Sequence, residues 1–175
     1  MGEALTIWTI GHSTRTESEF LALLITNEIK ILADVRRFPG SRKYPHFNQD
    51  AMICSLGEVG IEYLSLPELG GRRRPRPDSP NTAWRNESFR GYADYMETHD
   101  YRDGIARLLE LAGRGRTAFM CSEAPWWRCH RAMISDDLKS RGVTVIHIMS
   151  MKKNELHPYT SAATLVEGRL SYAAE

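Results

Sequence analysis

Short apolar runs rich in β-branched residues alternate along the chain with stretches long enough to form helices. This alternation is typical of parallel strands joined by helical crossover connections. The runs predict five strands, at Leu5–Ile10, Ile29–Val35, Ile61–Leu66, Thr117–Cys121 and Thr144–Ile148. We therefore expect an α/β fold, a Rossmann-like or flavodoxin-like three-layer sandwich in which helices flank about five mostly parallel strands.

Apolar residues spaced three and four apart predict amphipathic helices between these strands. The first follows a capping-box-like start at Thr16–Glu19. Further helices are expected over residues 49–56, 92–96, 101–112 and about 126–141. Residues 69–86 have little apolar periodicity, three prolines and the run Arg72-Arg73-Arg74, which predicts a long basic surface loop. The chain after Ile148 is expected to be irregular and to pack back on the body.

Composition narrows the class of protein. A chain of 175 residues suits one domain, 1–175, and 42% apolar with 26% charged residues is ordinary for a globular protein. Apolar runs are too short to cross a bilayer, so we expect no membrane partner. Three cysteines and no secretory signal pattern predict a cytoplasmic protein with free thiols. The net charge of +1 means that any preference for anions must come from local clusters.

Polar side chains follow the predicted strands at the edge where open parallel sheets bind their ligands. In chain order these residues are Gly11-His12-Ser13, Asp34-Val35-Arg36, Pro67-Glu68, Cys121-Ser122-Glu123 and His147. Thiol, imidazole, carboxylate and guanidinium groups are therefore expected at one rim, and this rim is the candidate functional site.

The segment from Cys121 to Arg131 carries the densest set of these groups. It is predicted to span a strand end, a turn and the start of a helix, where free N–H groups and the helix dipole attract anions and lower the pKa of a thiol. Cys121 is thus a candidate nucleophile, with a buried, inert cysteine as the alternative. Glu123 is a candidate general acid or base, and His12 a candidate proton carrier.

Arginines near this rim can bind phosphate or carboxylate groups bidentately. Solvated surface is the alternative for each of them. The candidate binding residues are Ser13, Asp34, Arg36, Ser41, Trp126, Trp127, Arg128, Cys129, His130, Arg131 and His147.

Metal binding is a weaker prediction. His12, Cys121, Cys129 and His130 have side chains that bind zinc, but their spacing matches no paired-ligand pattern. Adjacent residues also point in different directions on a helix, which argues against Cys129 and His130 acting together. We therefore expect no cofactor, with zinc as the alternative.

Nucleic acid is a second possible partner. Trp126 and Trp127, followed by Arg128, are suited to stacking on a base. The basic loop Arg72–Arg76, with Trp84-Arg85 near it, is suited to contacting backbone phosphates. Core packing of the tryptophans and a solvated loop are the alternatives.

Several motifs in a fixed order resemble one known family. They are Thr9-Ile10-Gly11-His12-Ser13, Asp34-Val35-Arg36 with Pro39, Ser41 and Phe47, Leu69-Gly70-Gly71, Cys121-Ser122-Glu123 through Cys129-His130-Arg131, and His147-Ile148. The sequence resembles the domain of unknown function 488 family over nearly its whole length, with Ser122 where alanine is usual. The resemblance implies an intracellular α/β protein of bacteria or archaea. It names no reaction.

Three functional hypotheses follow. The first is an enzyme, a hydrolase or transferase using Cys121 or Glu123, that acts on a phosphate-bearing or nucleotide-like small molecule. The second is a nucleic-acid-binding module for repair or modification. The third is a small-ligand-binding domain without catalysis.

Overall fold

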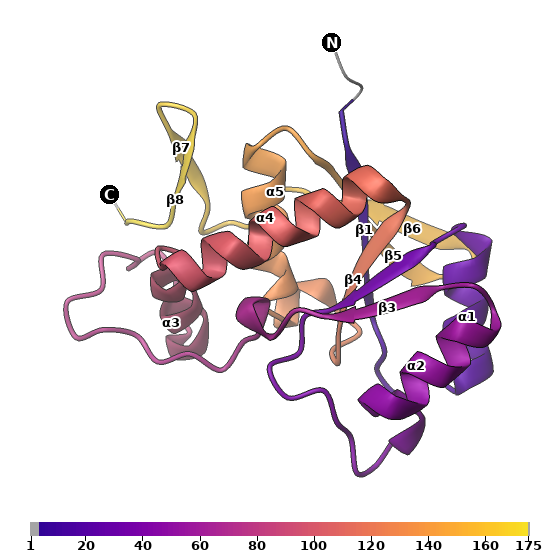
Figure 1. Ribbon diagram of the computed structural model, residues 1–175. Helices are drawn as coiled ribbons and strands as arrows, with labels where there is room; N and C mark the ends of the chain where they lie inside the picture. Colours follow the sequence, from indigo (N-terminus) through magenta and orange to yellow (C-terminus); the bar gives the residue numbers. More distant parts are fainter. Residues whose placement is uncertain (1–3, 175) are drawn as a thin grey trace.

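The computed structural model describes residues 4–174 and has a six-stranded sheet at its centre (Figure 1). The strands are β1 (Thr6–Gly11), β2 (Ile31–Asp34), β3 (Glu62–Ser65), β4 (Thr117–Cys121), β5 (Thr144–Ser150) and β6 (Lys153–Leu156). They are ordered β3-β2-β4-β1-β5-β6, and all pairs are parallel except β5 with β6. The predicted α/β fold and its five parallel strands are confirmed.

Helices cover both faces of this sheet (Figure 1). The α-helices are α1 (Glu17–Thr26), α2 (Gln49–Glu58), α3 (Glu87–Tyr95), α4 (His99–Arg114) and α5 (Arg131–Ser140). Short 3-10 turns lie at η1 (Pro45–Phe47), η2 (Pro67–Leu69) and η3 (Trp126–Arg128). The capping box expected before α1 is present, because the Thr16 side chain accepts from the Glu19 amide and the Glu19 side chain accepts from the Thr16 amide.

Alternation along the strands divides the core between the two faces. In β1, Ile7 packs with α3, α4 and α5, whereas Trp8 and Ile10 pack with α1 and α2. In β4, Phe119 and Cys121 lie on the same face of the sheet as Ile7. Successive side chains of a strand point to opposite faces. A side chain at a strand end is therefore committed to one of two layers, which decides what it can reach.

The region before α5 differs from the prediction. A continuous helix was expected from about residue 126, but α5 begins at Arg131 and the 3-10 turn Trp126–Arg128 precedes it. Cys129, between the two, has an extended backbone with φ −133° and ψ 154°, and His130 is the N-cap of α5. Pro125 precedes this 3-10 turn rather than the first turn of the α-helix.

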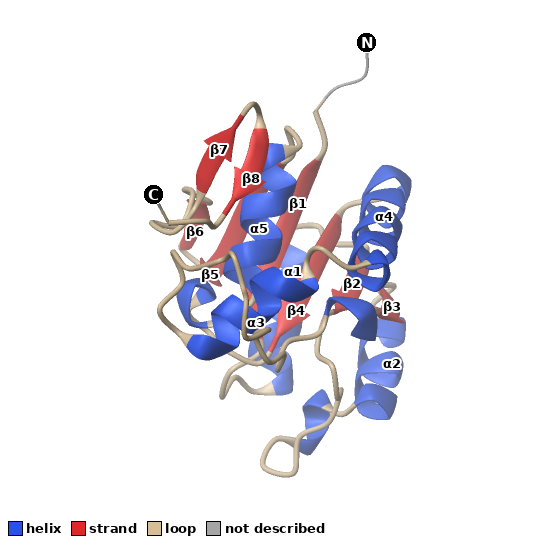
Figure 2. Ribbon diagram, turned by 90° about the vertical axis from the view of Figure 1, so that its left-hand side faces the viewer, coloured by secondary structure: helices blue, strands red, loops and turns tan. Residues whose placement is uncertain are grey.

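The C-terminal segment is more regular than predicted. Instead of irregular chain, it contains β6 at the sheet edge and a hairpin of β7 (Thr164–Val166) and β8 (Arg169–Ser171), which stands beside α5 in Figure 2. Gly168 makes the tight turn with φ +79°. The prediction failed because these strands are only three or four residues long and mostly polar.

The long loop expected over residues 69–86 is confirmed, and it is tied to α3. The Asp94 carboxylate accepts hydrogen bonds from the Arg76 amide (2.8 Å), the Ser79 hydroxyl (2.5 Å) and the Asn81 amide (2.7 Å). Burial alone would raise the pKa of Asp94, but these donors lower it. Over residues 4–174, no helix combines the length and apolar character needed to span a bilayer.

Candidate functional site

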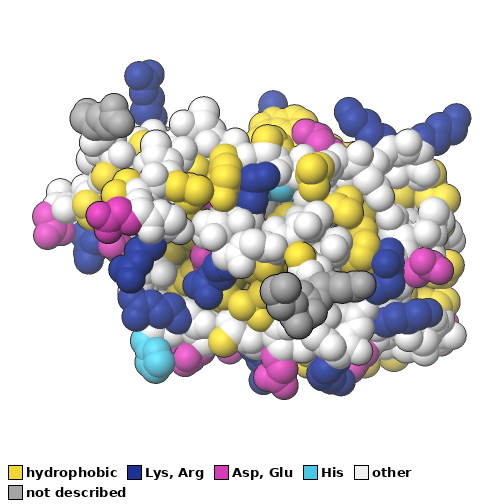
Figure 3. Space-filling model, turned by 90° about the horizontal axis from the view of Figure 1, so that it is seen from above, with side chains coloured by type: hydrophobic (Ala, Val, Ile, Leu, Met, Phe, Trp, Pro, Cys, Tyr) yellow, Lys and Arg dark blue, Asp and Glu magenta, His cyan; other side chains and the backbone are white. Residues whose placement is uncertain are grey.

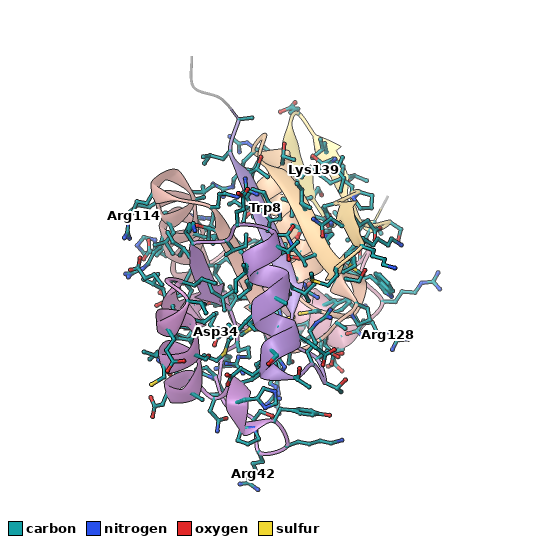
Figure 4. All side chains as sticks on the ribbon, turned by 90° about the vertical axis from the view of Figure 1, so that its right-hand side faces the viewer. Trp8, Asp34, Arg42, Arg114, Arg128 and Lys139 are labelled. Carbon is teal, nitrogen blue, oxygen red and sulfur yellow. The ribbon has the colours of Figure 1, made fainter. Side chains whose placement is uncertain are left out.

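A pocket of about 250 Å³ lies at the carboxyl ends of β2 and β4, closed on one side by α3 and by the start of the long loop. Its lining residues are Arg36, Arg37, Phe38, Gly40, Gly71, Arg72, Ser88, Phe89, Tyr92, Cys121, Ser122, Glu123, Arg128, Cys129 and His130. Four arginines and two cysteines share this space. In Figure 4, Arg128 lies at the right-hand edge of the molecule, whereas Asp34 lies within it at about the same height.

Gly11 lets the backbone close around the pocket. The pairing of β1 with β4 continues past the strand ends, because the amides of His12 and Ser13 donate to Cys121 O and Ser122 O, both at 2.9 Å. A Cβ at Gly11 would lie 1.7 Å from the carbonyl oxygen of Glu123. Only glycine permits this approach, which places the Cys121–Glu123 turn directly beyond β1.

The guanidinium of Arg36 is held rigidly at the pocket wall. Asp34 accepts from its Nε at 2.9 Å and from its Nη2 at 2.7 Å, and the Tyr63 hydroxyl donates to the same carboxylate at 2.5 Å. Burial would lower the pKa of Arg36, but the Asp34 carboxylate raises it, so the side chain stays charged. Its Nη1 is buried with no partner among the described residues. A fixed cation thus stands at the pocket wall, with one of its N–H groups unpaired in the described part of the chain.

Cys129 and His130 form a thiol–imidazole pair. Cys129 Sγ lies 3.4 Å from His130 Nδ1, and His130 Nε2 lies 3.1 Å from the carbonyl oxygen of Val35. A carbonyl only accepts, so His130 Nε2 carries the hydrogen, and Nδ1 presents a lone pair to the thiol. Burial lowers the pKa of His130 and keeps it neutral. The prediction that these adjacent residues point apart is wrong, because Cys129 is extended rather than helical.

The two cysteines of the pocket differ in their thiol pKa. Burial, with a hydrogen bond to Cys129, raises the pKa of Cys121 well above its usual range. Burial acts the same way on Cys129, but a hydrogen bond with Cys121 and the charge of Arg131 outweigh it and bring its pKa to about 7. Cys129 is therefore the thiol that ionises near neutral pH.

Arg131 contributes to the lowered pKa of Cys129. Its side chain is 1% exposed and donates to Thr9 Oγ1 at 3.1 Å and to the carbonyls of Glu123 and Ala124 at 2.6 and 3.0 Å. Within residues 4–174 it forms no ion pair with a carboxylate. A buried cation is costly unless it has a counter-charge. The charge of Arg131 accordingly favours ionisation of Cys129 and lowers the pKa of that thiol.

The pocket contains part of the predicted site. Of the predicted residues, Cys121, Glu123, Arg36, Arg128, Cys129 and His130 line it. Asp34 and Arg131 lie behind it and hold, respectively, Arg36 and the Cys121–Ala124 turn. Ser41 lines a separate shallow depression with Arg42, and Ser13 has a positive φ of 49° in the turn after β1.

Two predicted histidines lie outside the pocket. His12 stacks on Phe47 at 4.3 Å between ring centroids, and burial lowers its pKa to about 4. His147 is fully buried and stacks on Trp126 at 4.7 Å. Trp127, by contrast, is 51% exposed. Both histidines were expected at the rim because of their place in the sequence, but their side chains point into the core.

Several lining residues were missed by sequence reasoning. Arg37 follows Arg36, and its guanidinium donates to Arg72 O at 2.9 Å, which links the β2 end to the long loop. Tyr92, on α3, donates to Leu69 O at 2.7 Å. The Asn86 cap of α3, whose side chain accepts from Phe89 N, was the available signal, because it marks a helix start well before residue 92.

Charge elsewhere is mixed. On the face at the opposite end of the sheet, Lys and Arg side chains are spread among Asp and Glu (Figure 3). In the part of the chain from 4 to 174, no group of three or more His, Cys, Asp or Glu side chains is arranged to hold a metal ion.

The fold and the pocket define a three-layer α/β protein with two thiols and several arginines at the carboxyl edge of its sheet. A family model described as "Domain of unknown function DUF488" matches residues 16–138, and the chain belongs to this family. The resemblance noted from the motifs is thus confirmed. No curated protein and no solved structure shows significant similarity to the chain.

Proposed function

We propose that this protein is a thiol-dependent hydrolase or transferase that acts on a phosphate-bearing, nucleotide-like small molecule, with Cys129 as its nucleophile. The observation that carries the proposal is the arrangement of Cys129 Sγ, His130 Nδ1 and Val35 O in one line of contacts at 3.4 and 3.1 Å. A nucleophile, a base and a group that orients the base is the arrangement that thiol enzymes require.

The lining of the pocket supports an anionic substrate. Arg36 is fixed by Asp34, and Arg37, Arg72 and Arg128 lie around the same space. Planar guanidinium groups match the geometry of phosphate oxygens. A phosphate bound at these arginines would present its ester or anhydride bond to the thiol.

The proposed step balances its atoms and electrons. Cys129 Sγ donates an electron pair to the electrophilic centre, and its proton passes to His130 Nδ1. The bond to the leaving group breaks with both electrons on that group, which takes the proton from His130. Water, or an acceptor hydroxyl, then displaces Cys129 and gives its proton to His130 in the same way. Cys121 would stay protonated and donate to the Cys129 sulfur.

Two measurements test this proposal. The first is the release of inorganic phosphate from a panel of nucleoside mono- and diphosphates. Cys129→Ser is expected to abolish turnover, and Cys121→Ser, the matched variant of the neighbouring thiol, is expected to keep part of it. Turnover that survives in Cys129→Ser would overturn the proposal.

The second measurement is alkylation by iodoacetamide near neutral pH, in a Cys54→Ser background because Cys54 is exposed. Cys129 is expected to react faster than Cys121, and inorganic phosphate is expected to slow its reaction. Faster reaction at Cys121 would return the role of nucleophile to that residue, as the sequence first indicated.

A second candidate function, nucleic-acid binding, is favoured by one observation. Trp127 is 51% exposed and precedes Arg128, which lines the pocket. An exposed aromatic ring beside a cation is suited to stacking on a base. Binding of a single-stranded oligonucleotide that weakens steeply with salt, and is lost in Trp127→Ala, would favour this function. Trp84 is less suited to it, because it packs against Phe89 and Tyr172.

A further inference from the structure

A chain of buried hydrogen bonds runs from Arg131 to the carboxylate of Asp136. Arg131 Nη1 donates to Thr9 Oγ1 at 3.1 Å, and Thr9 Oγ1 lies 2.6 Å from His147 Nδ1. His147 Nε2 lies 2.8 Å from His157 Nδ1, and His157 Nε2 lies 2.8 Å from Asp136 Oδ1. The five side chains are at most 1% exposed. We call this set the relay chain.

Counting hydrogens gives the relay chain a single direction. The Asp136 carboxylate only accepts, so His157 Nε2 is a donor, and with both rings neutral the Thr9 hydroxyl, which accepts from Arg131, gives its own hydrogen to His147 Nδ1. His147 then carries its hydrogen on Nε2 and donates it to His157 Nδ1. His157 in turn carries its hydrogen on Nε2 and donates it to the Asp136 carboxylate. Both imidazoles are neutral in this arrangement, and every hydrogen bond points from the cation to the anion.

The anion at the far end is firmly held. Asp136 accepts from the Thr160 amide at 3.0 Å, from the Thr160 hydroxyl at 2.6 Å and from the Tyr172 hydroxyl at 2.7 Å. Trp126 stacks on His147 with an interplanar angle of 4°. These contacts fix both the charge and the ring orientations, so neither histidine can turn without breaking others.

The relay chain ends next to the reactive thiol. Arg131, whose partners are the Thr9 hydroxyl and the carbonyls of Glu123 and Ala124, follows Cys129 by two residues, and its charge lowers the pKa of that thiol. Tyr92, Cys121 and His130 are the other titratable groups that face this thiol. We propose that Thr9, His147, His157 and Asp136 are positioning residues, which act through Arg131 to hold Cys129 in its reactive state. This inference rests on the proposed role of Cys129.

The proposal gives a role to a part of the chain that the family model does not cover. The matched region ends at residue 138, yet His147 comes from β5, and His157 and Tyr172 come from the segment after β6. Figure 2 shows this segment and its hairpin beside α5. The C-terminal segment would thus support Arg131 through buried hydrogen bonds, although none of its described residues lines the pocket.

The direction of the relay chain is tested first in the unaltered protein. In protein labelled with nitrogen-15 in histidine, NMR shifts of the ring nitrogens distinguish the two tautomers. His147 and His157 are both expected to carry hydrogen on Nε2 and not on Nδ1. A hydrogen on Nδ1 of either ring, including a doubly protonated ring, would overturn the proposal. This test needs no variant and therefore no assumption about folding.

The action on Cys129 is tested with Asp136→Asn, Thr9→Val and the double variant, all in the Cys54→Ser background. In Asp136→Asn the asparagine amide donates a hydrogen bond to His157. This reverses the direction of the hydrogen bonds in the relay chain, so that His147 donates to Thr9 instead of accepting from it. Thr9→Val removes the link itself. Each is expected to slow alkylation of Cys129 at about pH 6.5 by roughly three- to tenfold, through a higher thiol pKa. The double variant is expected to be no slower than either single one.

Tyr101→Phe is the matched control, because Tyr101 also donates from a buried position to an α5 carboxylate, that of Asp137, at 2.7 Å. It is expected to lower the melting temperature without changing the pH profile of alkylation. An unchanged pH profile of alkylation in Asp136→Asn, or additive effects in the double variant, would mean that the relay chain stabilises the fold but does not act on Cys129. If the profile shifts but Cys129→Ser keeps turnover, the proposed function fails and this inference stands.

Discussion

Acid should destabilise this protein well above the pH at which carboxylates lose their charge, because two histidines are buried as neutral rings. Burial lowers the pKa of His12 from 6.5 to about 4, and burial, with His157 and Arg131 nearby, lowers that of His147 to about 2. In the unfolded chain both take up a proton as the pH falls through 6.5, whereas in the folded chain neither does until far lower. Their contribution to stability is thus complete above 6.5 and is lost below it.

The size of the loss follows from this difference. At pH 5, protonation of each of these histidines stabilises the unfolded chain by about 2 kcal/mol relative to the folded one. The pH then lies about 1.5 units below the ordinary histidine pKa, and each unit is worth about 1.4 kcal/mol. Folded His12 has barely begun to titrate at this pH, and folded His147 has not. The two together remove about 4 kcal/mol from the free energy of unfolding, a large part of the roughly 5–15 kcal/mol typical of a domain.

Urea unfolding at about pH 7.5 and about pH 5 measures this difference. His12→Gln is expected to reduce the loss between the two pH values from about 4 to about 2 kcal/mol. His99→Gln is the control, because the His99 side chain is 85% exposed, and it is expected to leave the loss unchanged. A loss below about 1 kcal/mol in the unaltered protein would refute the reasoning, since it would mean that the buried rings gain protons as easily as exposed ones.

Three further outcomes are expected. Gly11→Ala should lower the free energy of unfolding by more than about 3 kcal/mol, because the added Cβ would lie 1.7 Å from a backbone carbonyl oxygen. Gly113→Ala, at a helical position with open space around it, should raise the free energy of unfolding by about 0.5–1 kcal/mol. Thermal unfolding of the two variants measures both effects. Asp34→Asn should cost about 3–5 kcal/mol in urea unfolding, because Arg36 loses its buried partner. Asp94→Asn should speed tryptic cleavage within residues 72–76, and an unchanged cleavage rate would mean that the loop is held by other contacts.

The sequence predicted the sheet well because its signal there is strong. Five parallel strands came from apolar runs bounded by polar residues, and their edges differ from the prediction by only one or two residues, as for Leu5–Ile10 against Thr6–Gly11. The short polar strands of the C-terminal segment gave no such signal. The place of the pocket also followed from the sheet, because the carboxyl ends of parallel strands meet at one edge.

The roles within the pocket could not be predicted in the same way, because they depend on backbone detail. Cys129 was expected on a helix, where its side chain would point away from that of His130. One extended residue before the N-cap brings the two together. Likewise His147 was expected at the rim, but its side chain points to Trp126 and His157 inside the protein. Distances of a few ångströms decide such roles, and spacing along a sequence does not contain them.

The position of β1 in the sheet has a consequence for the order of folding. Near the beginning of the chain, β1 has its place in the middle of the sheet, where Trp8 pairs with Ala118 of β4 and with Ile146 of β5. During synthesis this apolar strand leaves the ribosome long before either neighbour exists. Contacts between such distant parts of a chain form slowly. The nascent protein must therefore carry an unpaired, aggregation-prone strand until β5 has been made.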